Sequence, residues 1–227
     1  MIPLKDDNPI SSRPIVTYFL IGMCVVVFLM QLGSQSYRTG QLFYSYGLIP
    51  SVLMGHDQLP MDLYAVPAYL TIFSSMFMHG GWIHLIGNMW YMKIFADNIE
   101  DNVGSRNFII FYILCGIGAA MAQVLMDTHS QVPMVGASGA IGGVLGAYLI
   151  NHPNARVLVL IPYIIITIIK IRALYVLGFW FILQFISSGG GVAYAAHIGG
   201  FVSGMILILF FNKKTKRKSK VVKGPWS

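Results

Sequence analysis

Six apolar segments stand out in the pattern of hydrophobic and polar positions along the chain. We expect them to form helices at 14–32, 81–97, 105–126, 137–151, 173–187 and 194–211. About 20 consecutive apolar residues cross a bilayer as a helix, and several of these segments reach or approach that length without a charge. The pattern therefore predicts an all-α polytopic membrane protein, with a six-transmembrane-helix bundle over residues 14–211.

Two further apolar stretches do not fit this number of spans. The stretch VLVLIPYIIITII, between Arg156 and Lys170, has only 13 residues, includes Pro162 and has cations at both ends. A crossing would leave one set of charges on the wrong side, so we predict an interfacial or re-entrant loop on the cytoplasmic side. The segment 63–78 contains Pro67, and we predict that it is a membrane-associated part of a long first loop.

The cations predict the orientation of the bundle. With six spans and the N-terminus inside, Arg38 is the one cation left outside. The cytoplasmic set consists of Lys5, Arg13, Lys93, Arg106, Arg156, Lys170, Arg172 and the seven cations from Lys213 to Lys223. Cytoplasmic loops carry an excess of Lys and Arg. We therefore predict that both termini are cytoplasmic, with a short segment at 1–13 and a basic tail at 212–227.

Composition supports a membrane protein and excludes other classes. Hydrophobic residues make up 56% of the 227 residues and charged residues 10%, which is unlike a soluble domain. The first apolar segment is too long for a signal peptide and lacks a small-residue cleavage site, so we keep it as a span. The net charge of +7 is concentrated in the tail, where a juxtamembrane anchor is simpler than a nucleic-acid contact. We expect a multi-pass protein of the cell membrane, bound to the lipid bilayer and not to nucleic acid.

Four polar side chains fall at one depth in this arrangement. The second, fourth and sixth predicted helices all run from outside to inside, and His84, Asn88, Ser138 and His197 lie near their N-terminal ends. At 1.5 Å of rise per residue, we expect each of the four to lie roughly 5 to 10 Å below its helix start. The sequence therefore predicts a polar layer in the outer part of the membrane.

Small residues repeat at every fourth position on two of these helices. They are Ser138, Gly142 and Gly146 on the fourth helix, and Ala196, Gly200 and Gly204 on the sixth. Faces of this kind let two helix backbones approach closely in lipid. If the two faces meet, the Ser138 hydroxyl and the His197 imidazole come within hydrogen-bonding distance.

A serine beside a histidine can carry nucleophilic catalysis. Taken alone, Ser138 fits a capping residue of a glycine-rich packing helix, and His197 fits a bundle histidine bonded to a carbonyl oxygen. Together they suggest a dyad, because a neutral imidazole can accept the serine proton and deliver it to a leaving amine. Asn88, His84 and the backbone N–H of Ser138 are candidate donors to the developing oxyanion.

Other catalytic patterns are excluded. A nucleophile elbow reads G-x-S-x-G, whereas position 140 is alanine and the strand–turn–helix context is missing. Asp97, Glu100 and Asp101 fall at the inner end of the second helix, across the bilayer from Ser138, so we expect no triad. The histidines lack zinc spacing such as H-E-x-x-H, and there is no Walker-type glycine pattern. We therefore expect neither a metal nor a cofactor.

At these residues the chain resembles the rhomboid family of intramembrane serine proteases. Three motifs carry the resemblance, in the family's order: HGGWIHLIGNMW at 79–90, GASG at 136–139 and AHIGGFVSG at 196–204. The resemblance implies a nucleophile at Ser138 and a general base at His197. It also implies that His84 and Asn88 lie on the oxyanion side and that His79 has a structural role in holding the first loop. Many members carry a Trp-Arg pair where this chain has Leu70-Thr71, a departure that concerns the anchoring of the first loop.

The expected function is that of an intramembrane serine endopeptidase, which cleaves transmembrane segments of membrane-protein substrates near their outer end through an acyl-enzyme. One alternative is a catalytically inactive rhomboid-like protein that binds clients, although the intact serine and histidine argue against it. A small transporter is another, but the sequence shows neither inverted repeats nor polar residues reaching both sides. The aromatic residues of the fifth helix fit either a lateral gate, with 187–191 as its hinge or cap, or an aromatic belt.

Overall fold

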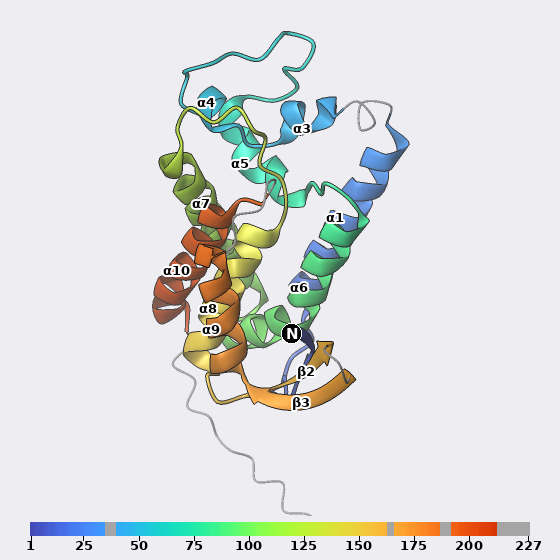
Figure 1. Ribbon diagram of the computed structural model, residues 1–227, viewed down its shortest axis with the longest axis vertical. Coiled ribbons are helices and arrows are strands. Elements are labelled where there is room, and N and C mark those ends of the chain that lie inside the picture. The colour runs from blue at the N-terminus through green and yellow to red at the C-terminus, as the bar shows by residue number, and fades with distance from the viewer. Residues whose placement is uncertain (35–39, 163–165, 187–191, 213–227) are drawn as a thin grey trace, which may run out of the picture.

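Six long helices form the body of the computed structural model (Figure 1). The structure describes residues 1–34, 40–162, 166–186 and 192–212, and for Pro162 and Ile166 it describes the backbone alone. They are α1 (Ile15–Gly33), α6 (Trp82–Val103), α7 (Ser105–Met126), α8 (Ser138–Asn151), α9 (Ala173–Ile186) and α10 (Tyr194–Phe211). All six predicted helices are confirmed. The predicted hinge or cap at 187–191, and the tail from 213 onward, lie outside the described residues.

The six helices differ in how well they suit a bilayer. Three of those described, α1, α7 and α10, are long and apolar enough to cross a membrane by length and composition. Helices α8 and α9 are apolar but have 14 residues each, which corresponds to roughly 21 Å of helix. Helix α6 has 22 residues and carries charged side chains toward its end.

A small sheet corrects two of the predictions. Strands β2 (Arg156–Pro162) and β3 (Ile166–Arg172) form an antiparallel hairpin, and β1 (Ile2–Asp6) pairs with β2 to give the order β1-β2-β3. The fold is therefore not all-α, and the stretch between α8 and α9 is not a re-entrant loop. Val157 and Val159 are fully buried while Leu158 and Leu160 are partly exposed, which is the two-residue period of a strand. Pairing with β1 then satisfies backbone groups along one edge of the hairpin.

Carboxylates near the end of α6 attach the N-terminal segment to the bundle. Glu100 is fully buried, and its carboxylate accepts hydrogen bonds from the backbone N–H groups of Val16 at 3.0 Å and Thr17 at 2.8 Å. These donors belong to the first turn of α1, where backbone N–H groups find no carbonyl acceptor within the helix. Asp101 accepts from the backbone and hydroxyl groups of Ser11. These contacts explain why α6 continues beyond its predicted end at position 97.

Glycines bring the backbones of α8 and α10 into contact. A Cβ atom on Gly200 would lie 1.9 Å from the carbonyl oxygen of Gly139, and one on Gly204 would lie 1.8 Å from that of Gly143. No larger residue fits without separating the helices, as the small-residue pattern predicts. The α8 residues that approach α10 most closely are thus Gly139 and Gly143, each one position after a residue of the predicted row that begins at Ser138. The predicted row also faces α10, through Gly142 against the His197 backbone and Gly146 against the Phe201 backbone.

The first loop folds into short helices at the end of the bundle opposite the sheet (Figure 1). They are α3 (Gln41–Tyr46), α4 (Pro50–Leu53), α5 (Thr71–Ser74) and the 3₁₀ turns Ala68–Leu70 and Ser75–Phe77. Leu70 and Thr71 stand where the resemblance implies a Trp-Arg pair, and the described contacts of the loop lie elsewhere. The Ser74 hydroxyl donates to the carbonyl of Tyr46 at 2.6 Å, and Leu48 forms a backbone bridge with Met134.

His79 joins the first loop to α1, in agreement with its expected structural role. Its side chain is fully buried, and its backbone N–H and C=O are both bonded to the side-chain amide of Gln31, at 3.1 and 3.2 Å. The loop therefore ends at a fixed position directly before α6, which carries the next two residues of interest.

Candidate active site

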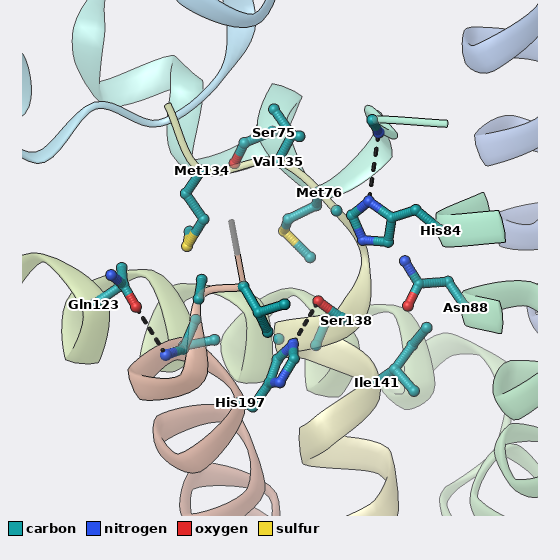
Figure 2. A pocket seen from close by; sticks show the side chains of 18 of the residues that line it. Ser75, Met76, His84, Asn88, Gln123, Met134, Val135, Ser138, Ile141 and His197 are labelled. Carbon is teal, nitrogen blue, oxygen red and sulfur yellow. Dashed lines mark hydrogen bonds between the residues drawn. The ribbon is translucent and has the colours of Figure 1, made fainter. Parts of the chain in front are cut away.

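Ser138 and His197 meet at the N-terminal ends of two packed helices. Ser138 is the first residue of α8, and His197 lies in the first turn of α10. The His197 Nε2 atom is 2.8 Å from the Ser138 Oγ atom, which is a hydrogen bond (Figure 2). The contact predicted between the two side chains is confirmed, and the close approach of the glycine rows explains it.

Gly136 shapes the turn that leads into Ser138. Its φ of 128° lies in a region that residues with a side chain rarely adopt, and its N–H donates to the carbonyl of Ser75 at 2.8 Å. A Cβ atom at this position would lie 2.7 Å from the Nε2 atom of His84 and 3.6 Å from the Ser138 Oγ atom. The glycine therefore allows the imidazole of His84 to lie beside the serine.

Asn88 lies one turn after His84 on α6 and carries an unused donor. Its side chain is 8% exposed, and its Nδ2 atom has no hydrogen-bond partner among the described residues. A buried N–H without a partner costs free energy, so such a group in a native fold needs an explanation. Figure 2 shows Asn88 and His84 on the opposite side of Ser138 from His197.

A cavity of about 1130 Å³ joins these side chains into one site. All four predicted residues line it, so their expected convergence on one site is confirmed, and their common depth in the membrane stays a prediction. The polar side chains on its wall include Ser75, His84, Asn88, Tyr91, Gln123, Ser130, Ser138 and His197. The lining residues that the structure describes include no Asp or Glu. The carboxylates of Glu100 and Asp101 instead bind the N-terminal segment, as described above.

Gln184 is a part of the site that sequence reasoning missed. It belongs to α9, and its Oε1 atom lies 2.8 Å from the Nδ1 atom of His197. The imidazole is therefore bonded through both ring nitrogens, to Ser138 on one side and Gln184 on the other. A signal was present, because Gln184 is the one polar amide in the otherwise apolar segment ALYVLGFWFILQFI.

The arrangement supplies the parts that acyl transfer requires. Ser138 provides a hydroxyl bonded to a histidine, as an activated nucleophile needs. The backbone N–H of Ser138 lies in the first turn of α8, where intrahelical acceptors are missing, and the Asn88 amide lies nearby. Donors of this kind can bind a developing oxyanion. Among the described residues there is no group of three or more His, Cys, Asp or Glu placed to hold a metal ion.

Comparison with known proteins shows to which family the sequence is similar. A family model described as the Rhomboid domain matches residues 67–214. RHOMBOID-like protein 5 of Arabidopsis thaliana is 32% identical over 138 residues, covering 60% of this chain and 42% of that protein. Rhomboid protease GluP of Bacillus subtilis (strain 168) is 28% identical over 197 residues, covering 86% and 34%. Rhomboid-like protease 3 of Toxoplasma gondii is 25% identical over 143 residues, covering 63% of this chain and 52% of that protein.

The match covers the whole of the site. Ser138, His197, His84 and Asn88 all lie within residues 67–214, together with the helices that carry them. The chain spans between about a third and a half of the length of these three relatives. With the family model matching more than half of its residues, and with apolar helices long enough to cross a bilayer, the chain belongs to the rhomboid family of membrane proteins.

Proposed function

We propose that the protein is an intramembrane serine endopeptidase in which Ser138 is the nucleophile and His197 the general base. The observation that carries the proposal is the 2.8 Å hydrogen bond between their side chains on the wall of a large cavity. A serine that merely capped a helix would occupy the N-cap position, but the N-cap of α8 is Ala137, and the Ser138 hydroxyl bonds to His197 instead.

The reaction follows from the positions of these groups. The Ser138 Oγ atom attacks the scissile carbonyl carbon, and its proton passes to the Nε2 atom of His197. The imidazolium then gives that proton to the leaving amine as the C–N bond breaks, which leaves an acyl-enzyme. Water attacks the ester next, again with His197 as base, and releases the new carboxyl end. The cavity is large enough to admit the water that this second step consumes.

Asn88 and the Ser138 backbone N–H are the proposed oxyanion donors. The unpartnered Nδ2 atom of Asn88 supports this role, since a donor that is idle in the free enzyme is available to the charge that develops during attack. His84 lies beside Gly136 on the same side of the serine and completes this wall. Its Nδ1 atom faces the N–H of Gly80 at 3.4 Å, which leaves Nε2 directed toward the serine side.

The charge distribution supports six spans with the sheet end in the cytoplasm. The sheet alone carries Lys5, Arg156, Lys170 and Arg172, and the N-terminus lies at the same end of the bundle (Figure 1). Because cytoplasmic segments are rich in cations, this end faces inward in our proposal, and residues 1–13 and 212–227 are cytoplasmic. The cavity then opens in the outer half of the cell membrane. Substrates are transmembrane proteins, cut near the outer end of a segment that unwinds locally.

A client-binding protein without catalytic activity is the main alternative. Such a protein would not need the serine and the histidine to be bonded to each other, nor an idle donor at Asn88. The geometry therefore favours the protease.

Substitution of the nucleophile tests the proposal. We expect Ser138→Ala to abolish cleavage of a co-expressed single-span substrate, while the folded protein remains in the membrane at its normal level. Ser45→Ala is the matched control, because Ser45 lies in α3 outside the cavity and its hydroxyl bonds to the carbonyl of Gln41. Cleavage that persists in Ser138→Ala would refute the proposal.

A further inference from the structure

We infer that Gln184 is a positioning residue that makes His197 a competent base while α9 is packed against the bundle. The inference rests on the proposed function, because it concerns the orientation of the same imidazole. It goes beyond a Ser-His dyad, since a third side chain from a third helix controls the histidine.

Gln184 lies on the face of α9 that packs against the rest of the protein. The buried residues of α9 follow helical spacing and are Ala173, Val176, Leu177 and Gln184. The opposite face is exposed and apolar, with Phe179 at 44% and Phe185 at 64% exposure. Gln184 itself is 9% exposed. A buried amide on an apolar helix is stable only with partners, and it has two, the Trp180 carbonyl and the His197 ring.

The Trp180 carbonyl determines the direction of each hydrogen bond in the site. A carbonyl oxygen can only accept, so the amide nitrogen of Gln184 must be the atom that faces it, at 2.7 Å. The amide oxygen therefore faces His197 and accepts the proton of Nδ1. With Nδ1 protonated, the neutral ring presents the lone pair of Nε2 to Ser138, whose hydroxyl donates. We assign this tautomer from the hydrogen-bond network.

A second contact from α9 supports the imidazole from the side. The ring centroids of Trp180 and His197 are 5.7 Å apart, with an angle of 36° between the planes. Gly142, one turn below Ser138 on α8, leaves room for this arrangement, because a Cβ atom there would lie 3.0 Å from the His197 carbonyl oxygen and 3.7 Å from the Trp180 ring. Two side chains of α9, Gln184 and Trp180, thus orient His197 in addition to its bond to Ser138.

The position of α9 is consequently coupled to the state of the base. When α9 is in place, Gln184 selects the tautomer that can accept a proton from Ser138. Displacement of α9 removes the acceptor of Nδ1–H and the neighbouring indole. The ring is then free to rotate, or to carry its proton on Nε2 instead of Nδ1, and in that tautomer Nε2 cannot accept the proton of Ser138. Gln184 takes no proton at any step, and it holds the Nδ1–H of the neutral and the protonated ring alike. The site is therefore switched off by movement of α9.

Two substitutions of Gln184 separate orientation from packing. Gln184→Leu keeps the volume but removes the acceptor. We expect it to slow labelling of Ser138 by a small fluorophosphonate roughly 10- to 100-fold, less than the about 10⁴-fold cost of losing the charged partner in Ser-His-Asp enzymes. Gln184→Glu keeps the acceptor for Nδ1–H and adds a charge that favours the imidazolium, while it loses the donor to the Trp180 carbonyl. We expect it to label well but with the acid limb of its pH–rate profile moved to higher pH. If Gln184 only filled space, the acid limb of the pH–rate profile would stay where it is in the wild-type protein. Gln184→Leu would then label no more slowly than Gln184→Glu.

Trp180→Ala tests the coupling to α9, since it weakens the packing of that helix while Gln184 remains. We expect slower labelling, whereas Phe179→Ala, on the exposed face, labels at the normal rate. Wild-type rates and an unchanged pH profile in both Gln184 variants would overturn the inference. If Gln184→Leu fails to fold, the profile of Gln184→Glu decides alone. A folded wild-type protein that is not labelled would instead refute the proposed function, so the two failures are distinguishable.

Discussion

The Oγ atom of Ser138 and the Nε2 atom of His197 lie 2.8 Å apart although 59 positions separate the two residues in the chain. They meet because α8 and α10 touch backbone to backbone through glycines below the site. Ser138 is also the first residue of α8, where its N–H is unpaired within the helix. The approach of the nucleophile to its base therefore depends on the contact between two helices, and one oxyanion donor depends on where α8 begins.

Gly204→Ala tests that contact. The added Cβ atom would lie 1.8 Å from the Gly143 carbonyl oxygen, so the helices must separate. Overpacking of this kind costs about 1–3 kcal/mol of the free energy of unfolding, and we expect cleavage to fall with it. Thermal unfolding in detergent measures the change. Gly22→Ala on α1, which has nothing within 4 Å of the new atom, should not destabilise the protein; equal stability of the two variants would contradict the packing account.

Asn88→Ala tests the oxyanion donor. The variant removes an N–H group that has no partner in the free protein, so stability should be nearly unchanged. Loss of one oxyanion donor lowers kcat about 10²- to 10³-fold in a serine protease, and we expect a decrease of that size with little change in KM. Steady-state cleavage of a transmembrane substrate in detergent provides both constants. Asn151→Ala, at the far end of α8, is the control, and an Asn88→Ala enzyme with normal kcat would remove Asn88 from the oxyanion site.

Glu100→Gln tests the attachment of α1. The carboxylate accepts four hydrogen bonds, from two backbone N–H groups and from the hydroxyls of Thr17 and Ser105. An amide replaces one acceptor oxygen with a donor that faces other donors, and loses the charge-assisted strength of the remaining bonds. We expect a loss of about 2–3 kcal/mol in the free energy of unfolding. Lys93→Gln, an exposed charge on the same helix, should change it little, and similar values for both would show that the buried carboxylate is dispensable.

Asp6 makes the docking of β1 depend on pH. Burial raises the pKa of Asp6 above its ordinary 3.8, although its carboxylate accepts a hydrogen bond from the Tyr148 hydroxyl. The docked strand therefore holds a proton more tightly than the free segment. This contribution is complete below about pH 4 and is lost as the pH rises through the raised pKa. We expect amide protection in β1, corrected for intrinsic exchange rates, to decrease from pH 4 to pH 7.

Asp6→Asn removes the titrating group, so that decrease should become smaller. Asp62→Asn, in the exposed first loop, should leave it as in the wild-type protein. Protection of β1 that rises with pH in the wild-type protein would contradict the effect attributed to Asp6.

The helices could be predicted because each is a long apolar segment bounded by charges, glycines or prolines. The convergence of Ser138, His197, His84 and Asn88 could be predicted because the three helices that carry them were expected to run in the same direction. The end of α6 could not be predicted, since the charged residues that follow position 97 look like a loop until their partners in the N-terminal segment are known. Glu100 and Asp101 form their hydrogen bonds with residues of the N-terminal segment, which lie far away in the sequence.

The sheet was missed for a related reason. A short run such as VLVLIP is apolar throughout, and its alternation becomes visible only when one face is covered. Its partner strand β1 is about 150 residues away in sequence, so no local pattern indicates the pairing. Gln184 was missed because a single amide in an apolar helix shows neither the direction of its side chain nor its partner. Both depend on how α9 is rotated against α10.

Identification of the residue that reacts with a fluorophosphonate tests the central claim most directly. In this reaction the Oγ–P bond forms as the P–F bond breaks, fluoride leaves, and the serine proton passes to the imidazole. Peptide mass spectrometry of the labelled, folded protein should place the modification on Ser138. The label should be absent from Ser138→Ala and His197→Ala and retained in Ser45→Ala. A folded wild-type protein that carries no label, or a label that persists in the Ser138→Ala variant, would contradict the account.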